Sequence, residues 1–264
     1  MSDDPPSSDP TPETLQKEIA KLRRRVARLE TQLEDVETVR DTNLRFLDRV
    51  SGELEAEKAR SRALLLNVLP ETIVERLDAG EGLIADRYDD VAVVFSDFVG
   101  FTQISGRLEV GELVRSLNAL FTAFDAACSD LAVEKIKTIG DAYMAAAGLP
   151  GTGSDHIAAA ADLALAMRVA VREAGDPWHV RIGLHSGPVV AGVIGTSKFV
   201  YDLWGDAVNV ASRLETTAPT DQIQVSETVA EALGDAFELE PRGAIELKGK
   251  GSTETFLLVG RRKD

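Results

Sequence analysis

The chain has 264 residues, a formal net charge of -15 and a hydrophobic share of 44%, which is enough for one buried core and a non-globular extension. The acidic balance argues against nonspecific binding to nucleic acid or anionic lipid, because phosphates attract a basic surface. No apolar run approaches the roughly 20 residues of a membrane span. The Pro/Ser-rich start lacks the basic and apolar parts of a secretory signal. We therefore expect a cytoplasmic protein.

The N-terminal quarter changes character at Leu15. Residues 1–14 are rich in proline and poor in apolar groups, which predicts disorder. Aliphatic residues then recur at alternating steps of four and three, a heptad pattern that predicts a parallel coiled coil over residues 15–69. The pattern comprises Leu15, Ile19, Leu22, Val26, Leu29, Leu33 and Val36. We call these seven residues the seam. Pro70 is expected to end the helix.

Two other interpretations of this arm are less favoured. A single solvated helix would leave the seam in water. The basic run of residues 21–28 suggests a membrane or nucleic-acid contact, but Glu18, Glu30 and Glu34 flank it. A solvated face of a coiled coil therefore accounts better for these charges.

Beyond a linker over residues 70–88, residues 89–264 are expected to form one globular domain. Val91 to Phe95 is typical of a buried strand, and residues 109–130, 155–173 and 206–216 have helical spacing. Strands are expected at residues 133–139 and 142–147, joined by a tight turn, and at 179–185 and 189–194, joined around Ser186-Gly-Pro188. This order predicts an α+β domain with the ferredoxin-like βαββαβ pattern and extensions. Cys128 lies in an apolar helical pattern and is expected in the core.

Two aspartates stand where these strands end. Asp97 follows a buried strand, and Asp141 lies in the turn between two strands. Two such carboxylates can hold Mg²⁺ ions for phosphoryl transfer. The turn and first helical residues at Phe98-Val-Gly-Phe-Thr102 offer backbone amides to a polyphosphate. Each aspartate taken alone is explained equally well as a helix cap or a turn residue.

Three segments together resemble the catalytic domain of class III nucleotidyl cyclases. They are Phe95-Ser-Asp-Phe-Val-Gly-Phe-Thr102, Glu134-Lys-Ile-Lys-Thr-Ile-Gly-Asp-Ala-Tyr-Met144 and Tyr201-Asp-Leu-Trp-Gly-Asp-Ala-Val-Asn-Val-Ala-Ser-Arg213. The resemblance runs from about Asp89 to the C-terminus and implies a homodimer with active sites at the subunit interface. It implies an adenylyl cyclase that converts ATP to cyclic AMP and pyrophosphate.

The resemblance also implies roles for individual residues. Asp97 and Asp141 match metal ligands for two Mg²⁺ or Mn²⁺ ions per site. Lys135 and Asp202 match the pair that selects the base, and a Lys donor with an Asp acceptor suits adenine. Asn209 and Arg213, one helical turn apart, match the residues that orient the ribose and stabilise charge on the α-phosphate. Lys248 matches a lysine that contacts the triphosphate.

Other polar residues near these motifs are expected to have structural roles. Lys137 is interpreted as a charge on the strand surface, His185 as a packed strand residue and Lys250 as a loop residue. Asp206 is interpreted as the N-cap of the helix that carries Asn209.

Two alternative functions remain open. Guanylyl cyclase activity is disfavoured by Lys135 and Asp202, since the family's guanylyl cyclases usually have Glu and Cys there. A catalytically silent dimerisation or nucleotide-binding module is disfavoured by the full set of matched residues. Similar helices in the family relay signals, so the resemblance also implies an upstream sensor or regulatory protein.

Overall fold

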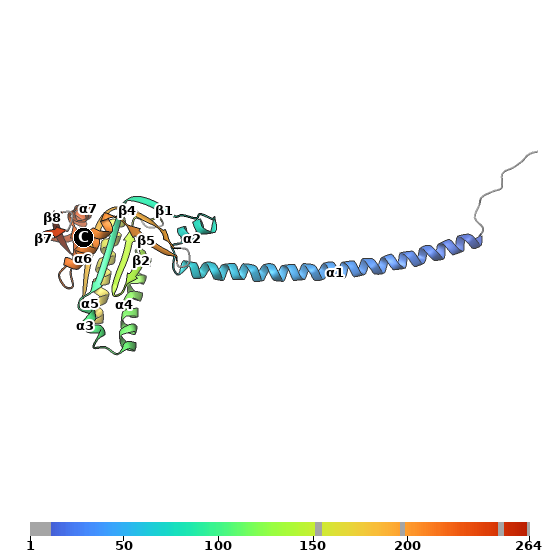
Figure 1. Cartoon of the computed structure of the whole chain (residues 1–264), viewed down its shortest axis with the longest axis horizontal. Coiled ribbons are helices and arrows are strands. Elements are labelled where there is room, and N and C mark those ends of the chain that lie inside the picture. Colours follow the sequence, from blue (N-terminus) through green and yellow to red (C-terminus); the bar gives the residue numbers. More distant parts are fainter. Residues whose placement is uncertain (1–11, 151–154, 196–198, 248–250, 263–264) are drawn as a thin grey trace, which may run out of the picture. The chain divides into compact units, whose positions relative to one another are not determined.

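The computed structural model describes residues 12–150, 155–195, 199–247 and 251–262. The chain divides into two compact units, Met1–Leu64 and Leu65–Asp264. The described residues of the N-terminal unit form one long helix, α1, which runs on to Leu66 in the second unit (Pro12–Leu66; Figure 1). It begins three residues before the predicted start, since a proline is tolerated in the first helical turn.

Helix α1 buries none of its residues. Every seam residue is exposed, for example Leu22 at 53% and Leu33 at 60%. An apolar stripe of this length in water favours association with another helix, so pairing of α1 as a coiled coil remains our prediction. None of the helices in the described ranges has the length and apolarity that crossing a membrane requires.

The second unit is built on one eight-stranded sheet. The strands lie in the order β2-β3-β1-β4-β6-β8-β7, with β5 paired to β4, and β4 and β6 are parallel. The strands are β1 (Ala85–Phe98), β2 (Glu134–Ile139), β3 (Ala142–Ala147), β4 (Val180–Ile194), β5 (Val200–Trp204), β6 (Ile223–Ser226), β7 (Phe237–Leu247) and β8 (Gly251–Arg261). The helices are α2 (Glu71–Asp78), α3 (Phe101–Ser105), α4 (Val110–Asp130), α5 (His156–Ala174), α6 (Asp206–Thr217) and α7 (Glu227–Leu233), followed by the short 3₁₀ helix η1 (Gly234–Ala236).

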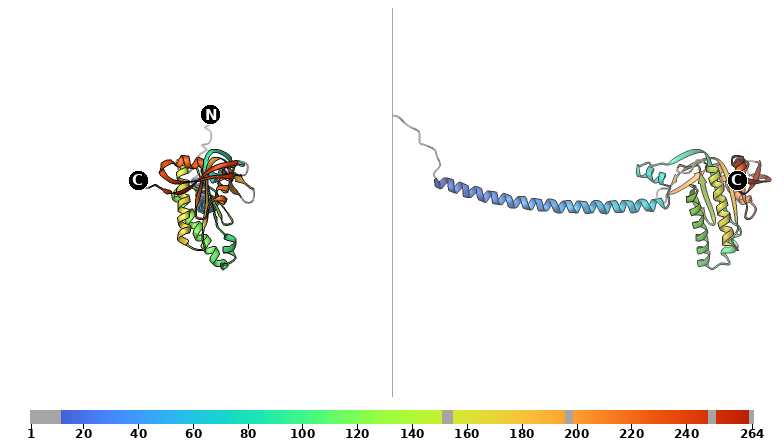
Figure 2. Two further views of the ribbon diagram at one scale, coloured as in Figure 1. Left: turned by 90° about the vertical axis from the view of Figure 1, so that its left-hand side faces the viewer. Right: turned by 180° about the vertical axis from the view of Figure 1, so that it is seen from behind.

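The predicted ferredoxin-like βαββαβ pattern is confirmed. The elements β1, α4, β2, β3, α5 and β4 follow one another along the chain, and their strands form the antiparallel order β2-β3-β1-β4. Successive residues of β1 alternate between two cores, because side chains of a strand point to opposite faces. Val94 packs into the core beneath α4 and α5, whereas Val93 packs into a second core with α2, β5 and α6. Figure 2 shows the domain from two further sides.

One predicted strand pair is wrong. Residues 180–194 form the single strand β4, without a turn at Ser186-Gly-Pro188. Proline cannot donate a ladder hydrogen bond, so it is tolerated in a sheet chiefly at edges and bulges. The register of β1 against β4 shifts between Tyr88 and Val91, which places a bulge of β1 opposite Pro188. The C-terminal half of β4 pairs with β1 on one side and with β5 on the other, and the sequence interpretation did not include β5.

Candidate active site

Asp97 and Asp141 come together at one end of the sheet. Asp97 lies one residue before the end of β1, and Asp141 lies in the turn between β2 and β3, next to Gly140, whose φ is 64°. The pKa of Asp141 is raised, first by partial burial and then by the negative charge of Asp97. Neither Asp97 nor Asp141 caps a helix.

The donor set suits a hard divalent cation. Mg²⁺ binds oxygen and is typically held by one or two carboxylates together with substrate phosphates. Two carboxylates whose charges repel each other gain stability from a cation between them. In the described part of the chain, no cluster of three or more His, Cys, Asp or Glu side chains is arranged to bind a metal.

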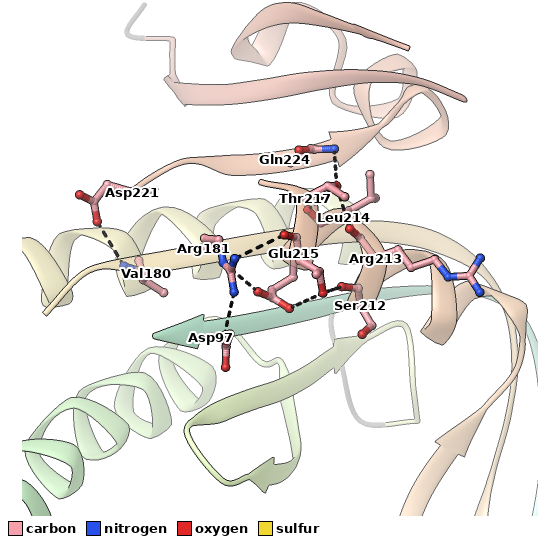
Figure 3. A network of polar contacts seen from close by, with 11 residues as sticks. Asp97, Val180, Arg181, Ser212, Arg213, Leu214, Glu215, Thr217, Asp221 and Gln224 are labelled. Atoms are coloured by element: carbon pink, nitrogen blue, oxygen red, sulfur yellow. Dashed lines mark hydrogen bonds and ion pairs between the residues drawn. The ribbon is translucent and has the colours of Figure 1, made fainter. Parts of the chain in front are cut away.

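Two residues that the sequence interpretation missed lie beside Asp97. Arg181 of β4 donates a hydrogen bond from Nη2 to Oδ2 of Asp97 over 3.0 Å (Figure 3). Its Nε lies 3.3 Å from Oε1 of Glu215 on α6, an ion pair without hydrogen-bond geometry. A signal for Glu215 was present, because it falls four residues after Ala211 on the apolar face of α6.

Glu215 is buried, with 7% of its surface exposed. Burial raises its pKa to about 7, with a further upward contribution from the charge of Asp97 and an opposing one from Arg181. Helix α6 approaches the sheet closely here, since a Cβ on Gly183 would lie 2.2 Å from the backbone nitrogen of Glu215. Gly183 therefore allows α6 to bring Glu215 alongside Arg181.

Asp202 of β5 pairs with Lys137, not with Lys135. Nζ of Lys137 lies 2.5 Å from Oδ2 of Asp202, and their side chains are 31% and 15% exposed. The interpretation of Lys137 as a strand-surface charge is therefore wrong. Asp202 also accepts a hydrogen bond from the backbone nitrogen of Leu203 over 2.8 Å, which fixes its orientation.

Lys135 has a different environment. Its Nζ lies 2.7 Å from the carboxylate of Asp125 on α4 and 5.3 Å from the ring centre of Tyr143. The cause is a register shift in β2 between residues 135 and 137. Lys135 is opposite Ala145, which belongs to the core beneath α4 and α5. Lys137 is opposite Met144, which belongs to the second core, so the two lysines lie on opposite faces of the sheet.

Asn209 and Arg213 share one face of α6. At 3.6 residues per turn they are about 40° apart, roughly opposite the face that Ala207, Ala211 and Leu214 bury. Asn209 donates a hydrogen bond to the carbonyl of Gly205 over 3.3 Å. Figure 3 shows the side chain of Arg213 directed away from Asp97 and Arg181. Within one chain, these two residues therefore face away from the paired aspartates.

The N-cap of α6 is Gly205, and the prediction that Asp206 is the cap is wrong. Asp206 is the first residue of the helix, where its charge still favours the helix N-terminus. Gly205 has a φ of 145°, and a Cβ there would lie 2.9 Å from the carbonyl oxygen of Pro188. The crossing over β4 thus requires glycine at this position.

Other sequence predictions have mixed outcomes. Cys128 is buried in the core, as predicted, with Sγ 3.5 Å from the hydroxyl of Tyr143. His185 contacts Ser226, with Nδ1 2.8 Å from Oγ. Lys248 and Lys250 lie outside the described residues.

Four exposed apolar residues, which we call the exposed apolar stripe, lie on either side of Asp202 along the ribbon formed by β4 and β5. Val190 is opposite Trp204, and Ile194 is opposite Val200, while Asp202 is opposite Gly192 between these two pairs. Directly opposite residues lie on the same face of a ribbon. The four apolar side chains are 37–59% exposed. A contiguous apolar face of this kind is typical of a surface that meets another protein.

Residues 83–260 match the adenylate and guanylate cyclase catalytic domain. This match covers more than half of the chain. The chain belongs to this family of class III cyclases. Catalytic domains of this family use divalent metal ions, as the resemblance implied.

Comparison with individual cyclases extends this assignment. The chain is 47% identical over 224 residues to an adenylate cyclase of Mycobacterium tuberculosis (strain ATCC 25618 / H37Rv). The matched region covers 83% of this chain and 51% of that protein. The chain thus spans about half the length of the curated relative. This matched region is longer than the part of the chain from residue 83 to its last residue, so the similarity to this relative extends into the segment before residue 83.

Solved cyclase structures share the fold. The guanylate cyclase domain of RhGC from Catenaria anguillulae, in complex with GTP, has a TM-score of 0.64 at 36% identity and covers 67% of this chain and 100% of its own. The adenylyl cyclase CyaB from P. aeruginosa has a TM-score of 0.64 at 27% identity and covers 68% of this chain and 98% of its own. The likeness to both kinds of cyclase leaves the choice of nucleotide to the site residues.

Proposed function

We propose that the protein is an adenylyl cyclase that converts ATP to 3′,5′-cyclic AMP and pyrophosphate. The observation that carries the choice of ATP is the contact between Lys137 and Asp202. Adenine presents an acceptor at N1 and a donor at its 6-amino group, which suit a lysine and an aspartate respectively. Guanine presents the opposite pattern at these positions and would leave both groups unpaired, which is costly in a partly buried pocket.

This proposal replaces Lys135 by Lys137 in the base-selecting pair. Lys135 is on the other face of the sheet and its ammonium contacts Asp125. Lys137 and Asp202 satisfy each other in the absence of a base. We expect adenine to exchange this direct contact for two hydrogen bonds of its own.

Asp97 and Asp141 would hold two Mg²⁺ or Mn²⁺ ions. The ions would supply charge neutralisation on the triphosphate and a lower pKa for the ribose 3′-hydroxyl. In the reaction, the 3′-oxygen forms a bond with the α-phosphorus while the bond from that phosphorus to the oxygen leading to the β-phosphate breaks, and the 3′-hydroxyl loses its proton. Asn209 would orient the ribose, and Arg213 would stabilise negative charge on the α-phosphate. Lys248 is retained as a proposed contact of the triphosphate.

The active unit is proposed to be a homodimer. Asn209 and Arg213 face away from the aspartates of their own chain, so a second copy is needed to bring both sets to one nucleotide. The exposed apolar stripe around Asp202 offers a surface for that copy. The seam of α1 offers another, and a parallel coiled coil would raise the effective concentration of one domain near its partner. An upstream protein that acts on α1 remains a proposed regulator.

The function is tested by incubating the purified protein with ATP and GTP in parallel, with Mg²⁺ and then Mn²⁺, and measuring products by mass spectrometry. Cyclic AMP from ATP, with little cyclic GMP from GTP, is the expected result. Preferential formation of cyclic GMP would establish a guanylyl cyclase instead. Absence of both products, together with retained nucleotide binding, would identify a silent module.

A further inference from the structure

We infer that Glu215 is a positioning residue that fixes the Asp97 carboxylate through Arg181. This inference rests on the proposed function, since it assigns Asp97 to metal binding. Asp97, at the proposed metal site, contacts Arg181, and Arg181 in turn contacts the buried Glu215 (Figure 3). Glu215 does not contact Asp97 itself.

The guanidinium of Arg181 is held at three points. Nη2 donates to Oδ2 of Asp97 over 3.0 Å, Nη1 donates to the carbonyl oxygen of Thr216 over 3.4 Å, and Nε lies 3.3 Å from Oε1 of Glu215. The Thr216 contact is long and has a neutral acceptor. Glu215 is therefore the charged partner, besides Asp97, that helps to fix where the planar guanidinium lies.

Burial argues that this charged partner has a purpose beyond packing. Glu215 is the only charged residue among the buried residues of the described chain. Removing a carboxylate from water is costly unless it is paired, and an apolar side chain of similar volume would fill the site at lower cost. Oε1 of Glu215 and Nε of Arg181 face each other without any other hydrogen-bond partner in the described residues. Oε2 of Glu215 accepts a hydrogen bond from Oγ1 of Thr216 over 3.2 Å, so Glu215 is held by its own helix while its charge attracts Arg181.

The consequence for Asp97 is a fixed carboxylate. With Oδ2 held by Arg181, Oδ1 is directed to a defined position without a loss of side-chain freedom when a cation binds. Partners that orient a metal ligand in this way typically contribute about 10-fold to 100-fold to metal affinity. Loss of Glu215 would release Arg181 and, with it, Asp97.

The test measures Mn²⁺ binding to the 264-residue protein by electron paramagnetic resonance in the presence of 3′-deoxy-ATP, which lacks the nucleophile. Glu215→Gln is expected to weaken Mn²⁺ binding at pH 7.5 about tenfold, while its thermal unfolding midpoint at that pH should not fall below that of the wild type. In cyclase assays the same change should raise the metal concentration needed for half-maximal rate more than it lowers the rate at saturation. Glu231→Gln, the same change at an exposed residue of α7, is the matched control and should bind Mn²⁺ as the wild type does.

Repeating the measurement in an Arg181→Lys protein separates a positioning role of Glu215 from the simple loss of its negative charge. Arg181→Lys keeps the positive charge but lacks the planar fork, so Glu215→Gln should then weaken Mn²⁺ binding less than twofold further. An unchanged tenfold effect in that background would overturn the inference, as would wild-type Mn²⁺ binding by Glu215→Gln. If Glu215→Gln fails to fold, Glu215→Asp, which keeps the charge but shortens the reach, takes its place with the same expected result. A wild type that makes no cyclic nucleotide would refute the proposed function separately.

Discussion

Two lysines on β2 show how a bulge of one residue decides which side chain contacts Asp202. Lys135 and Lys137 would share a face of a regular strand, because side chains two positions apart point the same way. The bulge between them sends Lys135 to Asp125 and Lys137 to Asp202. Lys137, and not Lys135, therefore contacts Asp202, the other residue that we propose reads the base.

We predict that Lys137→Glu combined with Asp202→Cys shifts the preference from ATP toward GTP. Glutamate accepts from the donors of guanine, while loss of the aspartate removes the acceptor for the 6-amino group. The ratio of kcat/KM for ATP to that for GTP should fall by about tenfold to a hundredfold, as loss of one or two hydrogen bonds implies.

The control for this prediction is Lys135→Glu combined with Asp202→Cys. This variant should lose activity with ATP through the change at Asp202 without gaining activity with GTP. A gain in GTP turnover by the Lys135 variant and not by the Lys137 variant would show that our assignment is reversed.

Glu215 makes the stability of the metal-free protein depend on pH. Its pKa rises on folding from 4.5 to about 7, so the folded state binds more protons than the unfolded state between these pH values. The free energy of unfolding must then fall as pH rises through that window, by at most about 1.4 kcal/mol per pH unit for one group. The contribution is present in full below pH 4.5 and is lost above pH 7.

Urea unfolding in EDTA at pH 5, 6 and 7.5 measures this effect. Relative to wild type, Glu215→Gln should become more stable as pH rises, because glutamine stays neutral throughout. Glu231→Gln should follow the wild-type curve in parallel. A constant difference between wild type and Glu215→Gln across the three pH values would contradict the raised pKa.

At the scale of elements, the approach of α6 to β4 sets the distance between Arg181 and Glu215. A Cβ on Gly183 would meet the backbone of both Ala211 and Glu215 at distances below 2.5 Å, so Gly183→Ala must push α6 away. We predict a loss of about 3 kcal/mol in the free energy of unfolding, measured by urea denaturation, and reduced cyclase activity.

Gly260→Ala in β8 is the matched control, because no atom lies within 4 Å of a Cβ placed there. Its unfolding free energy should stay within about 0.5 kcal/mol of wild type. Equal stability of the two variants would show that α6 has room to move without cost.

The order of elements in the ferredoxin-like core follows from local sequence patterns, because each strand and helix has a clear apolar period. The continuous strand β4 was missed because Pro188 normally interrupts a strand, and the bulge of β1 that accommodates it depends on pairing with a distant segment. Strands β5 and β6 are short, and β7 lies at the edge of the sheet, so their burial comes from tertiary packing. Such packing is weakly encoded in local propensity.

The residues of the candidate site that lie in short sequence motifs could be predicted from the sequence. Asp97 and Asp141 lie together as their places at strand ends implied. The partner of Asp202 was assigned to the wrong lysine, because a one-residue shift of register reverses the face of a strand. Arg181 lies in none of the three segments that carry the resemblance, and its meeting with Glu215 depends on the close packing that Gly183 permits.

At the scale of the whole molecule, the two faces of α6 lead to a test of shared sites. We predict that Asp97→Ala and Arg213→Ala each reduce cyclase activity at least 100-fold, because removal of a metal ligand or of a transition-state charge costs several kcal/mol. Mixing the two variants should restore part of the activity, at most about a quarter of the wild-type rate, since each mixed dimer keeps one intact site and random mixing makes half of the dimers mixed.

The control mixes Asp97→Ala with Asp141→Ala. Both variants lack a metal ligand from the same half of the site, so no mixed dimer has an intact site. Recovery in this mixture, or its absence when Asp97→Ala is mixed with Arg213→Ala, would contradict sites shared between chains.

The outward direction of Asn209 and Arg213 also has a kinetic consequence. If a single chain holds only half of each site, dilution separates the halves, and the rate per mole of protein must decline once the protein concentration falls below the dissociation constant of the dimer. In that regime the total rate grows with the square of the protein concentration. A covalent link between two chains would remove this dependence and make turnover first order in protein at any dilution.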